Sequence, residues 1–245
     1  MRILGWILAL SLVRAAFAAS APHDIAWTDH ARRFTGESAR VREKSIKALK
    51  ADPNLERKLR SAYGTNDHFL ALDVISVLRL RSLLPFLRDA SIRDRTGFSY
   101  HVMNSLLTKK ELPAYRDLYL ERLANPKSSP AAKMAILDSL PRFRAEVPVS
   151  RLVAIFRDPS PEVRGSALAF ARHQVLSERR PEYIEILKPA IEDDAFQVRL
   201  QALYFLGEIP KRLRTARAKE FDEIIGRCRQ DPVASVRNLC QELAP

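Results

Sequence analysis

The sequence predicts an all-α fold, an α-solenoid of about seven antiparallel helix pairs. Apolar residues recur at helical spacing, and no stretch alternates apolar and polar residues for long enough to form a strand ladder. Fifteen Pro against seven Gly suit helices that are separated by Pro-marked turns. The stretch over residues 158–171 also returns over residues 193–206 and 231–243, and such self-similarity is typical of a solenoid.

Each copy of this repeat contains an Asp five residues before a Val-Arg pair. An Asp in the turn between two helices can accept backbone amides, and an Arg fork beside the core can reach the Asp of an adjacent unit. A structural role is therefore predicted for these residues in preference to catalysis. The repeated pairs are Asp158 and Arg164, Asp193 and Arg199, and Asp231 and Arg237, followed in each copy by a small residue, namely Ala167, Ala202 or Cys240.

The pattern of a turn Asp followed by Val-Arg and a small residue resembles the HEAT and HEAT-like repeat family, whose unit is a pair of antiparallel helices. The resemblance implies a ladder of Arg–Asp contacts between units. It also implies a non-enzymatic scaffold or adaptor that binds a partner. Three interior units lack the usual residues of the ladder, since Leu70-Ala71, Phe98-Ser99 and Ala132-Lys133 stand where Val-Arg is expected.

The second helix of each unit is identified by its first apolar residue, which we count as position zero. Positions zero, four, seven and eight then lie on one face at 100° per residue, and this face is predicted to form the core. Positions two, six and nine point the other way. The second helices are expected to start at Val41, Leu70, Phe98, Ala132, Val163, Val198 and Val236.

The first helices are expected between these starts. Pro residues at or near helix starts, such as Pro53 and Pro130, cost no hydrogen bond because the first-turn amides have no partner within the helix. The first unit is interpreted as a capping repeat. The expected first helices cover residues 25–34, 55–63, 83–87, 112–123, 147–156, 183–187 and 221–228.

The N-terminal residues are typical of a secretory signal peptide over residues 1–18. Arg2 supplies the positive start, residues 3–13 form an apolar run, and Ala16-Phe17-Ala18 matches a small-x-small cleavage site. The run is short for a bilayer span, and an uncleaved N-terminal anchor is the alternative interpretation. We expect an exported protein, periplasmic or secreted, whose residues 19–245 form a single HEAT-like domain.

Basic residues dominate the charge of the chain. The formal charge is +12 and falls to +10 when residues 1–18 are removed with their two Arg residues. This balance favours anionic partners, but it does not choose among acidic proteins, anionic lipid surfaces and nucleic acid. Basic clusters lie over residues 31–60 and, before the last unit, at Lys211, Arg212, Arg214, Arg217 and Lys219. The first cluster is interpreted as a solvated helix face and the second, in the long link into the last unit, as a solvated loop. The alternative for each is an anionic docking patch.

An alternative function follows from the basic charge, because some HEAT-like proteins of similar length are DNA glycosylases that hold a duplex on a basic concave surface. That function implies an aromatic cluster with a paired acid, and none is evident. The two Trp residues are Trp6 in the signal and Trp27 in the cap. Export also separates the chain from chromosomal DNA. Nucleic acid is therefore disfavoured, and the expected partner is another protein, with an anionic membrane surface as a second candidate.

No catalytic constellation is evident in the sequence. The five His residues are dispersed, and none belongs to a His-x-x-x-His pair. His23-Asp24 and Asp29-His30 come nearest to a metal cluster but lack a third convergent ligand. There is no Gly-rich phosphate loop and no nucleophile elbow. We expect neither an enzyme nor a bound cofactor or metal.

The two cysteines, Cys228 and Cys240, fall on opposite helices of the last unit. In an oxidising compartment they could form a disulfide that ties down the terminal repeat. Alternatively they are small core residues, since Cys240 aligns with Ala167 and Ala202 of the sister units. Both interpretations remain open at this level.

The predicted binding surface lies at position two of the second helices. This position is polar in the terminal units, at Glu43 and Asn238, and mostly apolar between them. In solenoids of the resembled family this face is the inner, concave one, so a shallow apolar groove for a peptide or helix is predicted there, flanked by basic residues of the first two units. The alternative is that the neighbouring second helix covers position two and makes it part of the core. The residues assigned to the groove are Leu72, Tyr100, Met134 and Leu200, with Tyr204 at position six.

Overall fold

The computed structural model describes residues 28–29, 31, 39–143 and 146–243, and all regular structure within them is helical. The predicted signal peptide over residues 1–18 lies outside these residues. Of the first predicted helix, over residues 25–34, only Thr28, Asp29 and Ala31 are described, and these three are helical.

The chain divides into two compact units, Met1–Asp89 and Ala90–Pro245. The single domain predicted over residues 19–245 stays a prediction, because a continuous repeat array can also divide into compact parts where neighbouring repeats pack less closely. The two units are described separately below.

The first unit is built from short amphipathic helices. Helix α4 packs against α5, and Leu49, Leu59 and Val74 are among the residues buried in its core. The elements are α3 (Ala39–Ala51), α4 (Leu55–Ala62), α5 (His68–Leu78), the 3₁₀ turn η2 (Arg81–Leu83) and α6 (Leu84–Ala90), whose last residue already belongs to the second unit.

The second unit continues the alternation of shorter and longer helices. Its elements are η3 (Ser91–Arg93), α7 (Phe98–Leu106), α8 (Leu112–Ala124), α9 (Pro130–Ser139), η4 (Leu140–Phe143), α10 (Val149–Ile155), α11 (Pro161–Leu176), η5 (Pro181–Ile186), α12 (Leu187–Ile191), α13 (Phe196–Glu208), α14 (Lys211–Ala216), α15 (Ala218–Cys228) and α16 (Ala234–Leu243).

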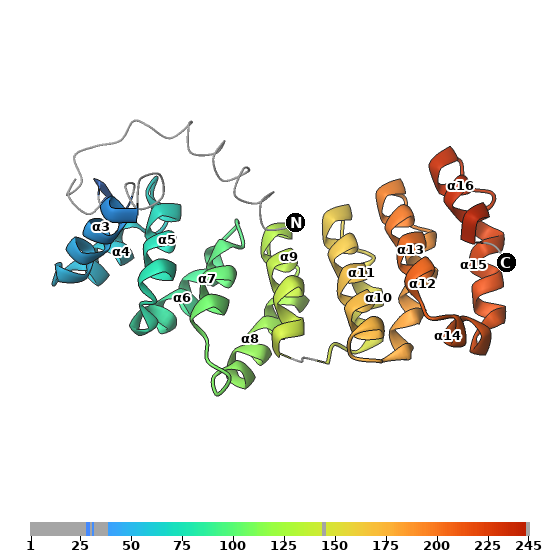
Figure 1. Ribbon diagram of the computed structural model, residues 1–245, viewed down its shortest axis with the longest axis horizontal. Helices are drawn as coiled ribbons and strands as arrows, with labels where there is room; N and C mark the ends of the chain where they lie inside the picture. The colour runs from blue at the N-terminus through green and yellow to red at the C-terminus, as the bar shows by residue number, and fades with distance from the viewer. Residues whose placement is uncertain (1–27, 30, 32–38, 144–145, 244–245) are drawn as a thin grey trace. The chain divides into compact units, whose positions relative to one another are not determined.

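Within the second unit the extensive packing joins elements that are neighbours in the repeat order. Helix α9 packs against α11, α11 against α13, and α13 against α16, so these second helices lie side by side in succession (Figure 1). The first-helix elements follow the same order, with α10 against η5 and α12 against α15. Each helix pair therefore buries its apolar surface mainly against the next pair.

Two helices of the second unit begin at a Ser-Pro pair that can be recognised in the sequence. The Ser160 hydroxyl accepts the amide of Val163 at 3.3 Å, and the Ser129 hydroxyl accepts the amide of Ala132 at 3.1 Å. A Pro follows each Ser at the first helical position, where a missing amide costs nothing. These Ser-Pro pairs fix where α9 and α11 begin.

The predicted second-helix starts are confirmed to within a few residues, but one predicted loop is wrong. The link before the last unit was expected as a loop, and it contains α14 (Lys211–Ala216) and the start of α15. Its sequence, KRLRTA, has a single large apolar residue, Leu213, so no apolar periodicity marks it as a helix.

The predicted core face is confirmed in α11 and α13 and is wrong in α5. Positions zero, four, seven and eight of α11 and of α13 are all buried. In α5, Leu70 is only half-buried and Val77 is 48% exposed, whereas Ala71, Leu72 and Ile75 are fully buried. The buried face of α5 is therefore rotated by about one residue, or about 100°, from the predicted one.

Small residues allow close contact between neighbouring second helices. A Cβ atom on Gly207 would lie 2.9 Å from Leu243 Cδ2 of α16, and one on Gly165 would lie 2.8 Å from Gln201 Oε1 of α13. Gly97, just before α7, has a φ of +74°, and a Cβ there would meet the Ala131 carbonyl oxygen at 2.4 Å. A side chain at Gly97 would thus be opposed both by the left-handed backbone and by α9.

Candidate functional site

The turn Asp residues act as predicted, by accepting backbone amides two residues further along. Asp158 Oδ1 accepts the amide of Ser160 at 3.0 Å, Asp193 Oδ1 that of Ala195 at 2.9 Å, and Asp231 Oδ1 that of Val233 at 2.8 Å. The same contact recurs at Asp94 and Asn125, which the sequence analysis did not single out. Their signal was available, because Asp and Asn favour such turns between helices.

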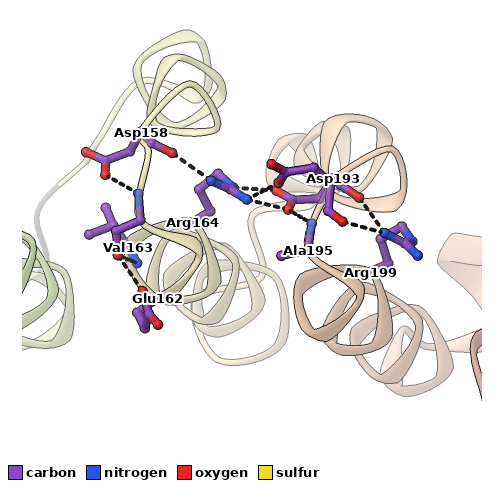
Figure 2. A network of polar contacts seen from close by, with 9 residues as sticks. Asp158, Glu162, Val163, Arg164, Asp193, Ala195 and Arg199 are labelled. Carbon is purple, nitrogen blue, oxygen red and sulfur yellow. Dashed lines mark hydrogen bonds and ion pairs between the residues drawn. The ribbon is translucent and has the colours of Figure 1, made fainter. Parts of the chain in front are cut away.

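Two of the three repeated Arg residues, Arg164 and Arg199, each contact two turns at once. Arg164 Nη1 donates to the carbonyl oxygen of Asp158 in its own unit at 2.7 Å, while its Nε and Nη2 donate to the two carboxylate oxygens of Asp193, both at 2.7 Å (Figure 2). Arg199 repeats this geometry with the carbonyl of Asp193 and the carboxylate of Asp231. The predicted ladder between adjacent units is therefore confirmed at these two steps.

The ladder extends one step further toward the N-terminus than the Val-Arg pattern indicated. Lys133, which stands in the Arg position of its unit, donates from Nζ to Asp158 Oδ2 at 2.6 Å. At the other end, Arg237 donates to the carbonyls of Asp231 and Pro232, which lie in its own unit. Among the described residues the ladder thus runs from Lys133 to Arg237.

The buried charges of the ladder are mutually compensated. The side chains of Arg164 and Asp193 are 6% and 2% exposed, so each needs its partner. The hydrogen bonds that Arg164 donates to Asp193 and Arg199 donates to Asp231 raise the pKa of each Arg. Burial alone would raise the pKa of Asp231, but the hydrogen bonds from Arg199 and the Val233 amide outweigh it and the pKa is lowered. The paired Arg and Asp side chains stabilise each other's charged forms, which suits a structural role between repeat units.

Two residues assigned to the predicted groove belong to the core instead. Leu72 is 0% exposed and Tyr100 is 1% exposed. The Tyr100 ring packs edge-on against Tyr119 of α8, with ring centres 5.2 Å apart, and burial raises the pKa of Tyr100. Position two of α5 and α7 is therefore covered by packing, and these two residues are not available to a partner.

Tyr119 anchors a buried polar cluster behind Tyr100. Its hydroxyl donates to Asn104 Oδ1 at 3.0 Å, and Asn104 in turn bonds the hydroxyl of Ser139 in α9. Burial raises the pKa of Tyr119 far above its usual range, so it remains a neutral donor. This cluster joins α7, α8 and α9, and each polar group in it has a partner, as burial requires.

The other three residues assigned to the groove are half-buried or exposed, and two of them lie on α13. Tyr204 is 58% exposed and Leu200 is half-buried, while Met134 is half-buried on α9. Phe196, at the first turn of α13, is 40% exposed and was not assigned to the groove. Its spacing could have revealed it, because Phe196, Leu200 and Tyr204 recur every four residues and so lie along one side of the helix. We call these three residues the α13 stripe.

The surroundings of the α13 stripe are polar and small. Gln201 lies on the flank toward Gly165 of α11, and an ion pair between Arg172 of α11 and Glu208 crosses near the end of α13. The neighbouring helix α16 carries the exposed Asn238. The basic flank predicted from the first two repeat units belongs to the other compact unit, so its place beside this stripe stays a prediction.

The two cysteines are joined in the structure. Cys228 at the end of α15 and Cys240 in α16 form a disulfide, with Cα atoms 5.9 Å apart. Both residues are buried, so the bond lies within the core of the last helix pair. Of the two interpretations, the structure therefore shows the disulfide, and the alternative of two unbridged core cysteines is wrong.

The described residues provide neither a metal site nor a membrane-spanning helix. No group of three or more His, Cys, Asp or Glu among them could hold a metal ion. Of the residues that come nearest to a metal cluster in the sequence, His23, Asp24 and His30 lie outside the described part of the chain. No described helix is both long and apolar enough to cross a membrane.

The chain was compared with known proteins after these features were defined. No protein-family model matches the sequence, and no curated protein matches it.

Proposed function

We propose that the chain is a HEAT-like α-solenoid that acts as a non-enzymatic scaffold or adaptor. The proposal is supported by the packing order of the second unit, in which each helix pair contacts the next. It is also supported by the repeated Arg geometry, since Arg164 and Arg199 make equivalent contacts one unit apart. Side chains with fixed, compensated charges hold such an array together but are poorly suited to proton transfer.

We further propose that the protein works in an exported compartment, periplasmic or extracellular. Residues 1–18 have the composition of a secretory signal. The disulfide between Cys228 and Cys240 is in keeping with this location, because such bonds persist in oxidising compartments and are rare in the cytosol.

The single observation that carries the binding function is the exposure of the α13 stripe. Tyr204 and Phe196 are large, exposed residues on the same side of one helix, with the half-buried Leu200 between them. Rigid aromatic side chains of this kind are common anchors in protein interfaces. The stripe is about 12 Å long, since it spans eight residues at 1.5 Å each. This length suits two or three turns of an amphipathic helix laid along α13.

A display selection tests this function. A library of helical peptides, randomised at the i, i+3, i+4 and i+7 positions, is selected on the chain from residue 19 onward. Enrichment of apolar residues at these positions is expected, because they would face Phe196, Leu200 and Tyr204. Selected peptides should lose at least about tenfold in affinity for the double variant Phe196→Ser and Tyr204→Ser, measured by fluorescence anisotropy.

The matched control removes equally exposed apolar residues from elsewhere in the same unit. Ile92 and Val153 are 55% and 38% exposed on η3 and α10, so Ile92→Ser with Val153→Ser changes a similar apolar area. The control variant should bind the peptides normally, and both variants should melt close to the parent chain. Equal losses of affinity in the two variants, or no enrichment at all, would remove the α13 stripe as the docking site.

A further inference from the structure

Helix α3 carries a strongly basic outer face that the fold does not use. Its sequence over Ala39–Ala51 contains five cations and one acidic residue, Glu43. At 100° per residue, four of these cations fall within an arc of about 120°. Ser45 and Leu49, on the opposite side of the helix, are buried. The four cations, which we call the α3 basic face, are Arg40, Lys44, Lys47 and Lys50, and all of them are exposed.

Two cations of the next helix, in contrast, contact other side chains of the first unit. Lys58 of α4 donates to Asp52 at 3.0 Å, and the guanidinium of Arg60 lies over the Phe86 ring, 4.9 Å from its centre. No ion pair joins any residue of the α3 basic face to another described residue. Glu43, the one acidic residue of α3, falls within the same arc, so the face presents four cations against one carboxylate and keeps a net positive charge.

The second basic cluster of the chain is less suited to bind an extended anionic surface. Arg217 is paired with Glu220 at 3.2 Å, and Arg214 is only partly exposed, with a buried Nε. The helix α14 that carries most of the cluster is only six residues long. By contrast, the α3 basic face extends over about 15 Å from Arg40 to Lys50.

We propose that the α3 basic face binds the surface of a bilayer that carries anionic phosphate headgroups. Three of its four cations are Lys, whose compact ammonium groups on flexible stems can reach headgroup phosphates at different depths. Helix α3 contains no aromatic residue on which a base could stack, which disfavours single-stranded nucleic acid. Charge complementarity alone holds the two surfaces together, so binding is reversible and weakens with salt.

Vesicle co-sedimentation tests the proposal directly. The chain from residue 19 onward is mixed with vesicles of phosphatidylcholine alone or of equimolar phosphatidylcholine and phosphatidylglycerol, at low and at physiological salt. Each cation near an anionic surface raises binding about fivefold. The quadruple variant Arg40→Gln, Lys44→Gln, Lys47→Gln and Lys50→Gln should therefore partition into the anionic vesicles about 10²- to 10³-fold less than the parent.

A control variant with the same change in net charge shows whether vesicle binding depends on the α3 basic face or only on the total positive charge of the chain. It replaces by Gln four exposed cations of the second unit for which no ion pair is seen, namely Lys211, Arg212, Lys219 and Arg229. The partition of this variant into the anionic vesicles should fall by less than about fourfold, compared with about 10²- to 10³-fold for the α3 variant. The smaller loss is expected because its four cations do not share one helix face. A third variant with Lys44→Arg, Lys47→Arg and Lys50→Arg keeps the charge and should bind like the parent.

Three results would overturn the proposal. If the α3 and control variants lose vesicle binding equally, binding depends on the net charge of the chain and not on the α3 basic face. Equal partition into neutral and anionic vesicles would show that the headgroup phosphate is not recognised. Duplex DNA that binds more tightly than anionic vesicles at equal salt, and that is released by the α3 variant, would make the same face a nucleic-acid surface. The α3 substitutions leave the α13 stripe intact, so peptide binding by the same variant tests the proposed scaffold function independently, while its circular dichroism spectrum, compared with that of the parent, checks that the helices are retained.

Discussion

At the scale of single residues, the repeated Arg joins local and long-range structure. One side of its guanidinium satisfies a turn carbonyl of its own unit, and the other side holds the carboxylate of the next turn. That carboxylate in turn accepts an amide two residues further along. Arg is suited to this position because its planar fork offers several donors in fixed directions, which a single ammonium group does not.

Arg199→Ala is predicted to destabilise the second unit strongly. The Asp231 side chain is 5% exposed, so removal of its partner leaves a buried carboxylate uncompensated. Such losses cost about 3–5 kcal/mol of unfolding free energy. Urea unfolding, followed by circular dichroism, measures the change.

An exposed ion pair provides the control for this prediction. Lys188 and Glu223 are 3.9 Å apart, and their side chains are about half exposed. Lys188→Ala should cost no more than about 1 kcal/mol, because water solvates the remaining carboxylate. If both substitutions cost the same, the ladder does not stabilise the unit as argued.

The sequence identified the ladder residues because a turn Asp and a core-edge Arg are set by local spacing. It could not decide whether position two is exposed. Leu72 and Tyr100 occupy the same register as Leu200, yet only the first two are fully covered. Coverage depends on how closely neighbouring helices approach, which is a property of the packed array and not of one helix.

At the scale of elements, helix starts were predictable where a capping residue marks them. Ser160 and Ser129 each precede a Pro, and the starts of α11 and α9 follow from them. Helix α14 was missed because its stability does not come from a periodic apolar face. It begins directly after Pro210, and this Pro was not used to predict a helix start.

Reduction of the disulfide is predicted to loosen the last helix pair. The bond closes a segment with a sequence separation of 12 residues, and loops of this size give about 3 kcal/mol of stabilisation. The effect should concentrate in α16, because this terminal helix packs against neighbours on one side of the array. Hydrogen exchange with and without a thiol reductant should show faster exchange of α16 amides, with α11 unchanged.

The double variant Cys228→Ala and Cys240→Ala is the control for chemical side effects of the reductant. It should match the reduced parent, and added reductant should not change it further. Uniformly faster exchange across α11 and α16 would instead show that the disulfide stabilises the whole unit cooperatively.

At the scale of the whole molecule, the all-helical class and the order of helix pairs followed from repetition in the sequence. What repetition could not give was the division at Asp89, because how closely neighbouring repeats pack is a property of the folded array and not of one repeat. The rotated face of α5 shows the same limit. An apolar residue at the expected position, Val77, lies exposed because the preceding residues of that helix pack better.

Stability of the whole molecule is predicted to fall in acid because turn carboxylates in both units have lowered pKa values. Hydrogen bonding from Lys58 lowers the pKa of Asp52, and hydrogen bonds from Thr96 and Ser99 lower that of Asp94 in spite of its burial. Asp231 behaves in the same way. The ordinary value is 3.8. A lowered pKa in the folded state gives stability that is complete above the unfolded value and is lost as the pH falls through the folded value.

The unfolding free energy should therefore be nearly constant near neutral pH and should decline below about pH 4, by as much as 1.4 kcal/mol per pH unit for each proton taken up on unfolding. Asp231→Asn should lower stability near neutral pH and make the decline below pH 4 shallower, since one of the responsible carboxylates is gone. Asp222→Asn, at an exposed position on α15, is the control and should leave the slope unchanged. Urea unfolding of the three proteins at a series of pH values measures both effects, and an unchanged slope in Asp231→Asn would contradict the assignment of acid sensitivity to the turn carboxylates.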